Sequence, residues 1–327
     1  MIGRYLGAES NANANNGARP LQHQAFAKPG QFFRGNLHTH STVSDGVLEP
    51  GEVCRRYAEA GYDFLCLSDH FVGIYGYPVT DTTGHRTNRF TTILGAEMHT
   101  HRMRNGEIWH ILAVGLPLGF APSDQANFDI NEDGETGPAL AQRCVDAGAF
   151  VAIAHPEWNG LTPEDARMIK AAHAVEIYNH GCHVECDRGY GIAAYDTLLS
   201  EGWKLTACAT DDAHFRGPDH FGGWVMVKAE LNDPDALLAA LKAGEYYAST
   251  GPELHDFRIE GDTVVIECSP ADHIIAVGAD TASKVAHGTG MTRAELPLER
   301  FREGCWVRAA VHDAAGKRAW SNPIWFA

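Results

Sequence analysis

Short apolar segments alternate with helix-like segments along most of the chain, from Phe32 to about Thr250. Val53 and Tyr57, four residues apart between Pro50 and Gly61, predict the first helix. Similar patterns predict helices at 137–147, 163–172, 190–201 and 234–243, and strands at 32–40, 62–68, 91–97, 107–115, 149–155, 174–179 and 204–211. This alternation is typical of a parallel α/β fold, because a helix usually joins the end of one parallel strand to the start of the next.

The pattern changes after residue 250 to short alternating segments separated by Gly, Asp and Pro, which is typical of antiparallel β-structure. The first 20 residues are rich in Asn, Ala and Gly and lack the apolar core of a signal peptide. We therefore predict a flexible leader over 1–30, an α/β domain over 31–250 and a small β-sandwich-like domain over 251–327. Residues 71–90, rich in Gly, Pro and Thr, are predicted to form a long loop.

The 327-residue chain has a formal net charge of −16 and no run rich in Lys or Arg. This argues against nucleic acid or an anionic membrane as the main partner, because both are bound through basic surfaces. No apolar stretch approaches the roughly 20 residues that span a bilayer. The eight cysteines are mostly isolated within apolar segments, as expected for reduced core thiols. We therefore expect a cytoplasmic protein with a small-molecule substrate, and the oligomeric state stays open.

Almost every predicted strand of the α/β part ends in a side chain that can bind a metal. In a parallel barrel the carboxyl ends of all strands open on one face, so these side chains would meet there. The candidates are His38, His40, Asp45, His70, Glu97, His110, His155, Asp212 and His214. A single histidine at a strand end is more often a structural residue, but nine candidates in matching positions favour a cluster. Since one ion needs three or four ligands, nine imply two or three ions.

Histidines mixed with carboxylates suit Zn, Mn or Fe, whereas Ca prefers oxygen ligands alone. Such ions can lower the pKa of a bound water to about 7, so a metal-bound hydroxide is the predicted nucleophile and no side-chain nucleophile is needed. The sequence contains no Gly-rich phosphate loop, G-x-S-x-G motif or dinucleotide fingerprint. Nucleotide-driven and serine-hydrolase chemistry are therefore not expected.

Seven motifs follow the order and approximate spacing of the PHP (polymerase and histidinol phosphatase) superfamily: "NLHTHSTVSDG", "LCLSDH", "LGAE", "HILAVG", "AHPEW", "EIYN" and "ATDDAH". Over about residues 33–250 the chain resembles this superfamily, and its CehA/McbA-like metallohydrolases, named after carbaryl hydrolases, most closely. The resemblance implies a distorted seven-stranded (β/α)7 TIM-like barrel with a cluster of two or three divalent ions.

The resemblance also implies which residues share an ion. The implied sets are His38, His40, Glu97 and Asp212 for one ion; Glu97, His110 and His155 for a second; and Asp45, His70 and His214 for a third. Many members of the superfamily carry a histidine where this chain has Asp45. Whether Asp45 holds an ion therefore decides between a two-metal and a three-metal centre.

Other residues are predicted around the mouth of the barrel. Asn179 and His180 follow the sixth strand and Arg216 follows His214, so we expect these three to contact the substrate, Arg216 through an anionic group. Asp69, just before His70, could hydrogen-bond a ligand imidazole. The segment "NHGCHVEC" at 179–186 could instead form a separate zinc site, although one short loop rarely supplies four zinc ligands.

Three functions are compatible with these residues. The first is hydrolysis of a small phosphate mono- or diester, for which at least two of the arginines at 86, 89, 102, 104 and 216 should lie near the metals. The second is hydrolysis of a carbamate or carboxylic ester, which an apolar mouth built from Phe71, Tyr75, Tyr77 and Trp158 would favour. The third is a non-catalytic binding protein whose metals only stabilise the fold.

Overall fold

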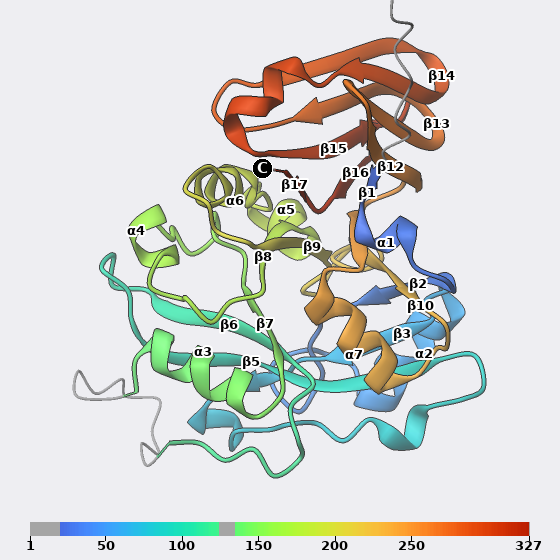
Figure 1. Cartoon of the computed structure of the whole chain (residues 1–327). Helices are drawn as coiled ribbons and strands as arrows, with labels where there is room; N and C mark the ends of the chain where they lie inside the picture. The colour runs from blue at the N-terminus through green and yellow to red at the C-terminus, as the bar shows by residue number, and fades with distance from the viewer. Residues whose placement is uncertain (1–19, 124–134, 327) are drawn as a thin grey trace, which may run out of the picture.

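The computed structural model describes residues 20–123 and 135–326 and has the mixed α/β fold that the sequence predicts (Figure 1). The strands of its first part are β2 (Gln31–Asn36), β3 (Phe64–Leu67), β4 (His70–Phe71), β5 (Thr91–Arg102), β6 (Ile108–Val114), β7 (Phe150–Ile153), β8 (Ala174–Asn179) and β9 (Thr206–Thr210). The helices are α1 (Gln24–Ala27), α2 (Pro50–Glu59), α3 (Gly137–Asp146), α4 (Pro163–Ala166), α5 (His180–Cys186), α6 (Ile192–Ser200) and α7 (Pro234–Ala243).

The first helix shows how local sequence sets these elements. Pro50 occupies the first turn of α2, where its missing N–H is not needed, and Val53 and Tyr57 are fully buried on one face. They pack with Leu65 and Leu67 of β3 in one apolar cluster. Two other helices differ from the sequence prediction. The helix predicted at 163–172 is the four-residue α4, and α5 was not predicted.

One strand departs from the predicted parallel arrangement. β2 pairs in parallel with β3, β3 and β4 with β5, β7 with β8, and β8 with β9, but β6 is antiparallel to both β5 and β7. The expectation of an all-parallel set of strands is therefore wrong at β6. Only five residues separate β5 from β6, and so short a connection cannot hold a crossover helix.

The sheet is open. No ladder joins β9 to β2 in the described residues; a single parallel bridge, Thr39 to Ala213, connects the segments that follow these two strands. The other side of β2 pairs with β10 (Trp224–Ala229), which pairs with β11 (Tyr246–Ser249), and neither of these strands was predicted. The closed seven-stranded barrel that the resemblance implies is thus not what the strand pairing shows.

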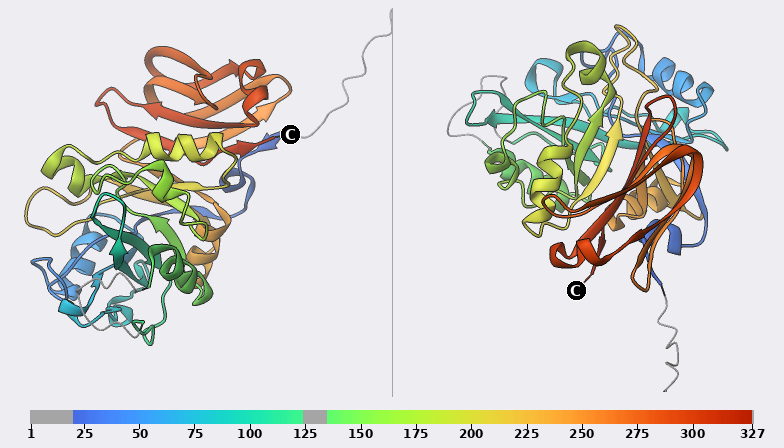
Figure 2. Two further views of the ribbon diagram at one scale, coloured as in Figure 1. Left: turned by 90° about the vertical axis from the view of Figure 1, so that its left-hand side faces the viewer. Right: turned by 90° about the horizontal axis from the view of Figure 1, so that it is seen from above.

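The C-terminal part is antiparallel, as predicted, and forms a layer at one end of the molecule (Figures 1 and 2). Its strands are β12 (Leu254–Glu260), β13 (Thr263–Val277), β14 (Ser283–Pro297), β15 (Trp306–His312), β16 (Arg318–Ser321) and β17 (Ile324–Trp325), with the 3-10 helix η3 (Glu299–Gly304) before β15. It is not a separate sheet, because β16 pairs with β11. The Arg308 guanidinium also donates to the Asp196 carboxylate of α6 at 2.9 and 2.7 Å.

Residues at the start of the described chain belong to this junction. β1 (Leu21–Gln22) pairs with β12, and α1 follows it, so residues 21–27 of the predicted leader are built into the fold; residues 1–19 lie outside the described residues. The predicted long loop contains two short 3-10 helices, η1 (Gly73–Tyr75) and η2 (Thr83–His85). All eight cysteines are free thiols and six are buried. Among the described residues, no helix combines the length and apolar character that a membrane crossing requires.

Candidate metal centre

The first two candidate ligands follow β2. His38 and His40 are fully buried, and their ring centroids lie 5.3 Å apart. Alternation along an extended chain turns both to one side, while Thr39 between them is bonded elsewhere. Its amide donates to Oγ of Ser68 at 3.0 Å and its hydroxyl to the carbonyl of Ala213 at 3.0 Å. The backbone that carries both imidazoles is thus fixed on both sides.

Strands β4, β5 and β6 bring four more side chains to the same place. His70 lies directly opposite Glu97, and His99 lies directly opposite His110. Glu97 and His99 are two apart on β5 and share a face. His110 is near the amino end of β6, and because β6 is reversed, this end lies beside the carboxyl ends of its neighbours. His99 was not predicted, although its spacing from Glu97 in "AEMHTH" is a signal that could have found it.

The segments after β7 and β9 carry backbone strain. His155 and Asp212 have positive φ angles of 22° and 54°, a region that non-glycine residues rarely adopt and that costs on the order of 1–3 kcal/mol. The Asp212 amide donates to the carbonyl of His38 at 2.8 Å, and its carboxylate accepts from Nδ2 of Asn179 at 3.0 Å. Strain that surrounding bonds hold in place is typical of functional sites.

Glu97 lies at the centre of the cluster and is 1 % exposed. Its Oε1 lies 2.7 Å from Nδ1 of His110 and 2.9 Å from Nε2 of His155. Its Oε2 lies 2.7 Å from Nδ1 of His70 and 3.5 Å from Nε2 of His38. A carboxylate with imidazoles at both oxygens has the arrangement that a bridge between two ions needs.

Asp212 is the second shared carboxylate. Its Oδ1 lies 2.9 Å from Nε2 of His40 and 3.3 Å from Nε2 of His38. Its Oδ2 lies 4.0 Å from Nε2 of His155. Asp212 therefore reaches imidazoles on both sides of the cluster, since His38 and His155 also contact Glu97.

Asp45 reaches the outer side of the cluster. Its Oδ1 lies 3.2 Å from Nε2 of both His70 and His214. The ring of His40 lies between them, with its centroid 4.2 Å from that of His70 and 4.3 Å from that of His214. The guanidinium of Arg216 lies 3.1 Å from Oδ2 of Asp45. An aspartate at this position is thus long enough to join two imidazoles in one ligand set.

Five sets of three or four potential ligand atoms lie within 4.8 Å of one another in the described structure. Three of them match the implied sets closely: His38, His40 and Glu97; Glu97, His110 and His155; and His40, Asp45, His70 and His214. The other two are His38, His155 and Asp212, and His70, Glu97 and His99. The structure therefore brings all nine predicted residues together and adds His99 as a tenth.

An unpaired buried atom supports a metal in this cluster. Nε2 of His38 is buried without a hydrogen bond to any described residue. Oε2 of Glu97, which also lies 2.7 Å from Nδ1 of His70, is 3.5 Å from this nitrogen. An unpaired buried polar atom costs about 1–3 kcal/mol, and a divalent ion held by both atoms would remove this cost. Imidazole and carboxylate donors together fit Zn, Mn or Fe.

Charges and burial shift the pKa values of the cluster in different directions. Burial alone would lower the pKa of His70, but the neighbouring Glu97 and Asp45 raise it to about 10, so an ion would have to displace the proton of this imidazole. Burial alone would raise the pKa of Glu97, but the charges of His110, His38 and His70 outweigh burial and hold this pKa well below its usual value. Burial, assisted by the neighbouring His99, lowers the pKa of His110 to about 3. An anionic carboxylate and a neutral imidazole are the forms that bind divalent metals.

Glu176 of β8 supports the cluster from behind and was not predicted as a site residue. Its carboxylate, 1 % exposed, accepts from Nδ1 of His38 at 2.9 Å and from the backbone N–H of His155 at 2.6 Å. Because Nδ1 of His38 is held in this way, Nε2 is the nitrogen that faces Glu97. The signal in the sequence was a charged residue inside the apolar strand "AVEIYN", since a buried carboxylate needs partners.

Asn179 and His180 do not occupy the substrate positions that we expected. Asn179 is fully buried and donates to Glu176 and Asp212, each at 3.0 Å, so it holds the cluster in place. His180 begins α5 and lies 2.9 Å from the Tyr178 hydroxyl through Nδ1. It is not among the described residues that line the pocket at the cluster. Neither residue lines the pocket, although Asn179 contacts Asp212, which does.

Asp69 differs from the prediction in its partners. Its carboxylate bonds no imidazole in the described structure; it accepts from the Ser41 amide at 2.7 Å, the Ser44 hydroxyl at 2.8 Å and the Thr80 hydroxyl at 2.6 Å. These bonds fix the loop that carries Asp45. Asp69 therefore acts, through the backbone of this loop, on the outer ligand set, which consists of His40, Asp45, His70 and His214.

The cluster lines a pocket of about 240 Å³. Arg216 is the one arginine and Trp158 the one expected aromatic among its described lining residues. The other arginines, Arg86, Arg89, Arg102 and Arg104, and the aromatics Phe71, Tyr75 and Tyr77 are not part of that lining. The pocket therefore has neither the two or more arginines expected for a phosphate ester nor the aromatic wall expected for an aryl ester or carbamate.

The segment 179–186 forms α5 and not a separate zinc site. No three potential ligand atoms from these residues, all of which the structure describes, come together. Cys182 does line the pocket, but burial and the nearby Asp212 raise the pKa of its thiol. The thiol therefore stays protonated and is a poor nucleophile.

Comparisons with known proteins give low structural similarity. No family model and no curated protein matches the sequence. A two-domain protein of Bacteroides vulgatus containing a predicted PHP-like metal-dependent phosphoesterase is 16 % identical, with a TM-score of 0.48, over 91 % of this chain and 96 % of that chain. A protein of Bifidobacterium adolescentis proposed to be a metal-dependent phosphoesterase is 15 % identical, with a TM-score of 0.42, over 63 % of this chain and 95 % of that chain. An amidohydrolase of Chromobacterium violaceum is 17 % identical, with a TM-score of 0.43, over 57 % of this chain and 89 % of that chain. Similarity at this level does not assign a function.

Proposed function

We propose that the protein is a metal-dependent hydrolase of the PHP type, which uses two or three divalent ions (Zn, Mn or Fe) to hydrolyse a phosphate mono- or diester of a small alcohol. The supporting observation is that neighbouring ligand sets share Glu97 and His155, and that both residues line one open pocket. Structural metal sites are usually closed and four-coordinate. In this proposal the sheet is a distorted barrel, incompletely closed between β9 and β2, with a β-sandwich-like domain after it.

The chemistry divides between the ions and the chain. When bound, the ions would lower the pKa of a coordinated water and polarise the ester. Glu97 and Asp212 would hold neighbouring ions close together by placing negative charge between them. Arg216 lies at the rim with an exposed side chain, so guanidinium N–H groups not used by Asp45 can bind a non-bridging phosphate oxygen.

The size of the pocket limits the substrate. A volume of about 240 Å³ is below the range of roughly 300–1,000 Å³ that is typical of pockets for drug-sized ligands. The ligand-bearing strand ends occupy one side of it. We therefore propose a substrate with one phosphate group and a small alcohol, in preference to a polymer.

Trp158 supports the alternative of an aryl carbamate or carboxylic ester. It is 41 % exposed, and its ring centroid lies 5.3 Å from that of His110 and 4.9 Å from that of His155. An aromatic leaving group could stack on this exposed ring beside the cluster. The single arginine in the pocket lining also suits a neutral ester.

Parallel assays on nitrophenyl esters test the two functions. The full chain, loaded in turn with Zn, Mn and Fe, is given 4-nitrophenyl phosphate, bis(4-nitrophenyl) phosphate and 4-nitrophenyl acetate. We expect turnover of a phosphate ester, its loss in Glu97→Gln, and full activity in the exposed control His255→Gln. Turnover of the acetate alone would favour the carboxylic ester function. Loss of stability on chelation without turnover of any ester would contradict both and favour a non-catalytic binding protein.

A further inference from the structure

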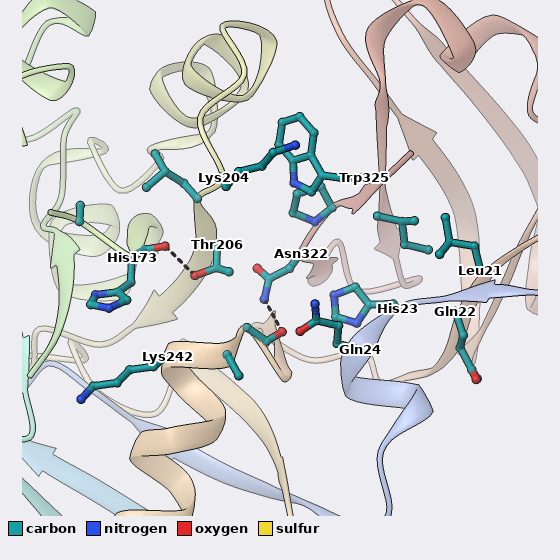
Figure 3. A pocket seen from close by; sticks show the side chains of 16 residues that line it. Leu21, Gln22, His23, Gln24, His173, Lys204, Thr206, Lys242, Asn322 and Trp325 are labelled. Atoms are coloured by element: carbon teal, nitrogen blue, oxygen red, sulfur yellow. Dashed lines mark hydrogen bonds between the residues drawn. The ribbon is translucent and has the colours of Figure 1, made fainter. Parts of the chain in front are cut away.

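A second pocket lies at the other end of β8 and β9 from the metal cluster (Figure 3). Its volume is about 450 Å³, and its lining comes from segments 21–24, 172–173, 204–206, 242–244 and 322–325. His173 precedes β8 and Leu205 precedes β9, whereas Asp212 follows β9. No described residue lines both pockets. This pocket is therefore separate from the metal centre and lies where the C-terminal strands meet the α/β part.

The lining of the second pocket is cationic. Lys204 and Lys242 are among its lining residues, and none of its 16 described lining residues is Asp or Glu. Figure 3 shows the side chain of Lys242 running away from Lys204 and His23. The whole chain, by contrast, has 42 acidic against 26 basic residues. The nearby Asp256 accepts from Gln22 at 2.7 Å and is also paired with Arg258. The local charge thus favours an anion inside a molecule that is otherwise acidic.

His23 adds an unused hydrogen-bond donor. It is 4 % exposed, and Figure 3 shows its ring beside Asn322 in the pocket. Its Nδ1 accepts from the Ala25 amide at 3.2 Å, so the proton of the neutral ring is on Nε2. No described residue bonds this Nε2. Burial lowers the pKa of His23 to about 4, so the ring is a neutral donor at pH 7.

The floor of the pocket is fixed before any ligand binds. Nδ2 of Asn322 donates to the carbonyls of Gly244 at 3.2 Å and Tyr246 at 2.9 Å, and its Oδ1 accepts from the Ala207 amide at 2.8 Å. These bonds tie β9, α7, β11 and the C-terminal segment together. A ligand therefore meets a preformed surface, which lowers the entropy cost of binding.

One wall of the pocket is apolar and aromatic. Trp325 lies beside Ile324 and Leu205, and Nζ of Lys204 is 3.3 Å from the centroid of the Trp325 ring. Lys242, by contrast, donates to the carbonyl of Gly148, which is not among the lining residues. Lys204 can thus bind a negative group while the tryptophan contacts a flat apolar body.

We propose that this pocket is a binding site for a small organic anion with a planar apolar body, such as an aryl carboxylate. The anionic group pairs with Lys204 and accepts from Nε2 of His23, and the apolar body packs on Trp325. A cavity of about 450 Å³ holds a ligand of one or two fused rings. Binding at this junction ties the C-terminal strands to the amino ends of β8 and β9.

Calorimetric titration with 2-naphthoate tests this proposal, with 2-naphthylmethylammonium as a cation of similar shape. The full chain is stripped of metal by chelation so that the carboxylate does not bind at the metal centre. We expect one equivalent of naphthoate to bind and the cation not to bind. Lys204→Gln should weaken naphthoate binding at least about fivefold, as expected for the loss of one charge pair. Lys242→Gln removes a charge that is directed away from Lys204, so it should bind naphthoate like the unmodified protein.

Two controls separate charge from structure. Lys204→Arg keeps the positive charge, and Lys170→Gln removes an exposed charge elsewhere, so both should bind naphthoate like the unmodified protein. The proposal is overturned if naphthoate does not bind at millimolar concentration or if the cation binds equally well. Unchanged affinity in Lys204→Gln would overturn it too, since binding would then be elsewhere. None of these results depends on hydrolase activity.

Discussion

Glu176 acts on the cluster through one nitrogen of His38. A histidine can offer either ring nitrogen to a metal, and the bond that the other nitrogen makes decides which one is offered. Here the buried Glu176 carboxylate holds Nδ1 at 2.9 Å, which turns Nε2 toward Glu97 and Asp212. The same carboxylate holds the backbone of His155. One residue outside the ligand sets thus orients two candidate ligands.

Replacing Glu176 with glutamine tests this role. Glu176→Gln keeps the size of the side chain but removes the charge that holds the His38 proton, so we expect metal affinity to fall about 10- to 100-fold. Competition against a chelator of known affinity measures the change. Glu164→Gln, on the exposed start of α4, is the matched control and should bind metal normally. Equal affinity in the two variants would mean that Glu176 has only a packing role.

The residues of the cluster were predictable from the sequence to different degrees. Most of the nine predicted ligands follow from one rule, which is that metal-competent side chains recur where strands end. His110, within a predicted strand, and Asp45, five residues after His40, are exceptions to it. His99, Glu176 and the true partners of Asn179 and Asp69 do not follow from that rule. Their positions depend on which strands are neighbours and on which side of a loop a carboxylate lies, and both are set only by the assembled fold.

At the scale of elements, strand positions were easier to predict than strand directions. The seven predicted strands match β2, β3 and β5–β9, with shifted ends in all of them but β8. An apolar pattern identifies a strand but says nothing of its direction, so β6 was taken as parallel. The short interval before β6 was the better guide, since it has no room for a crossover. The strands β10 and β11 were missed, although "WVMVKA" and "YYAS" are rich in β-forming residues.

The loop after His40 offers a prediction for an element as a unit. Asp69 holds this loop through Ser41 and Ser44, so Asp69→Ala should release the loop and remove Asp45 from His70 and His214. We expect about one ion fewer per chain at saturating metal, and a loss of about 1–3 kcal/mol in the free energy of unfolding. Elemental analysis and denaturant unfolding measure the two effects.

The matched control for this loop is Asp81→Ala. Asp81 caps a different, exposed loop through the Thr83 amide and hydroxyl. It should therefore keep the full metal content. If Asp69→Ala binds as many ions as the unmodified protein, the loop does not position Asp45 for an ion, or the outer site holds none.

At the scale of the whole molecule, His23 makes the junction sensitive to pH. Burial lowers its pKa from 6.5 to about 4, so between these pH values the unfolded chain binds a proton that the folded chain does not. The contribution of His23 to the free energy of unfolding is fully present above pH 6.5. It decreases as the pH falls from 6.5 to about 4, by about 3 kcal/mol in total. His23→Asn keeps a side-chain acceptor for the Ala25 amide but does not titrate.

We therefore expect the free energy of unfolding to fall less between pH 7 and pH 4.5 in His23→Asn than in the unmodified protein. Denaturant unfolding of metal-stripped protein at the two pH values measures this difference, and the protons taken up by the cluster cancel in the comparison. Parallel pH dependence in the two proteins would show that His23 is protonated in the folded state as readily as in the unfolded one.

The central claim is that Glu97 and Asp212 hold a cluster of ions, and anomalous diffraction tests it most directly. A crystal of the protein grown with Mn, Fe or Zn is measured above and below the absorption edge of the metal. We predict two or three anomalous peaks in this pocket, of which two lie within coordination distance of Glu97 or Asp212 and a third, where it occurs, lies within coordination distance of Asp45. The absence of peaks in this pocket at saturating metal, or a single closed four-coordinate ion, would contradict the proposed hydrolase centre.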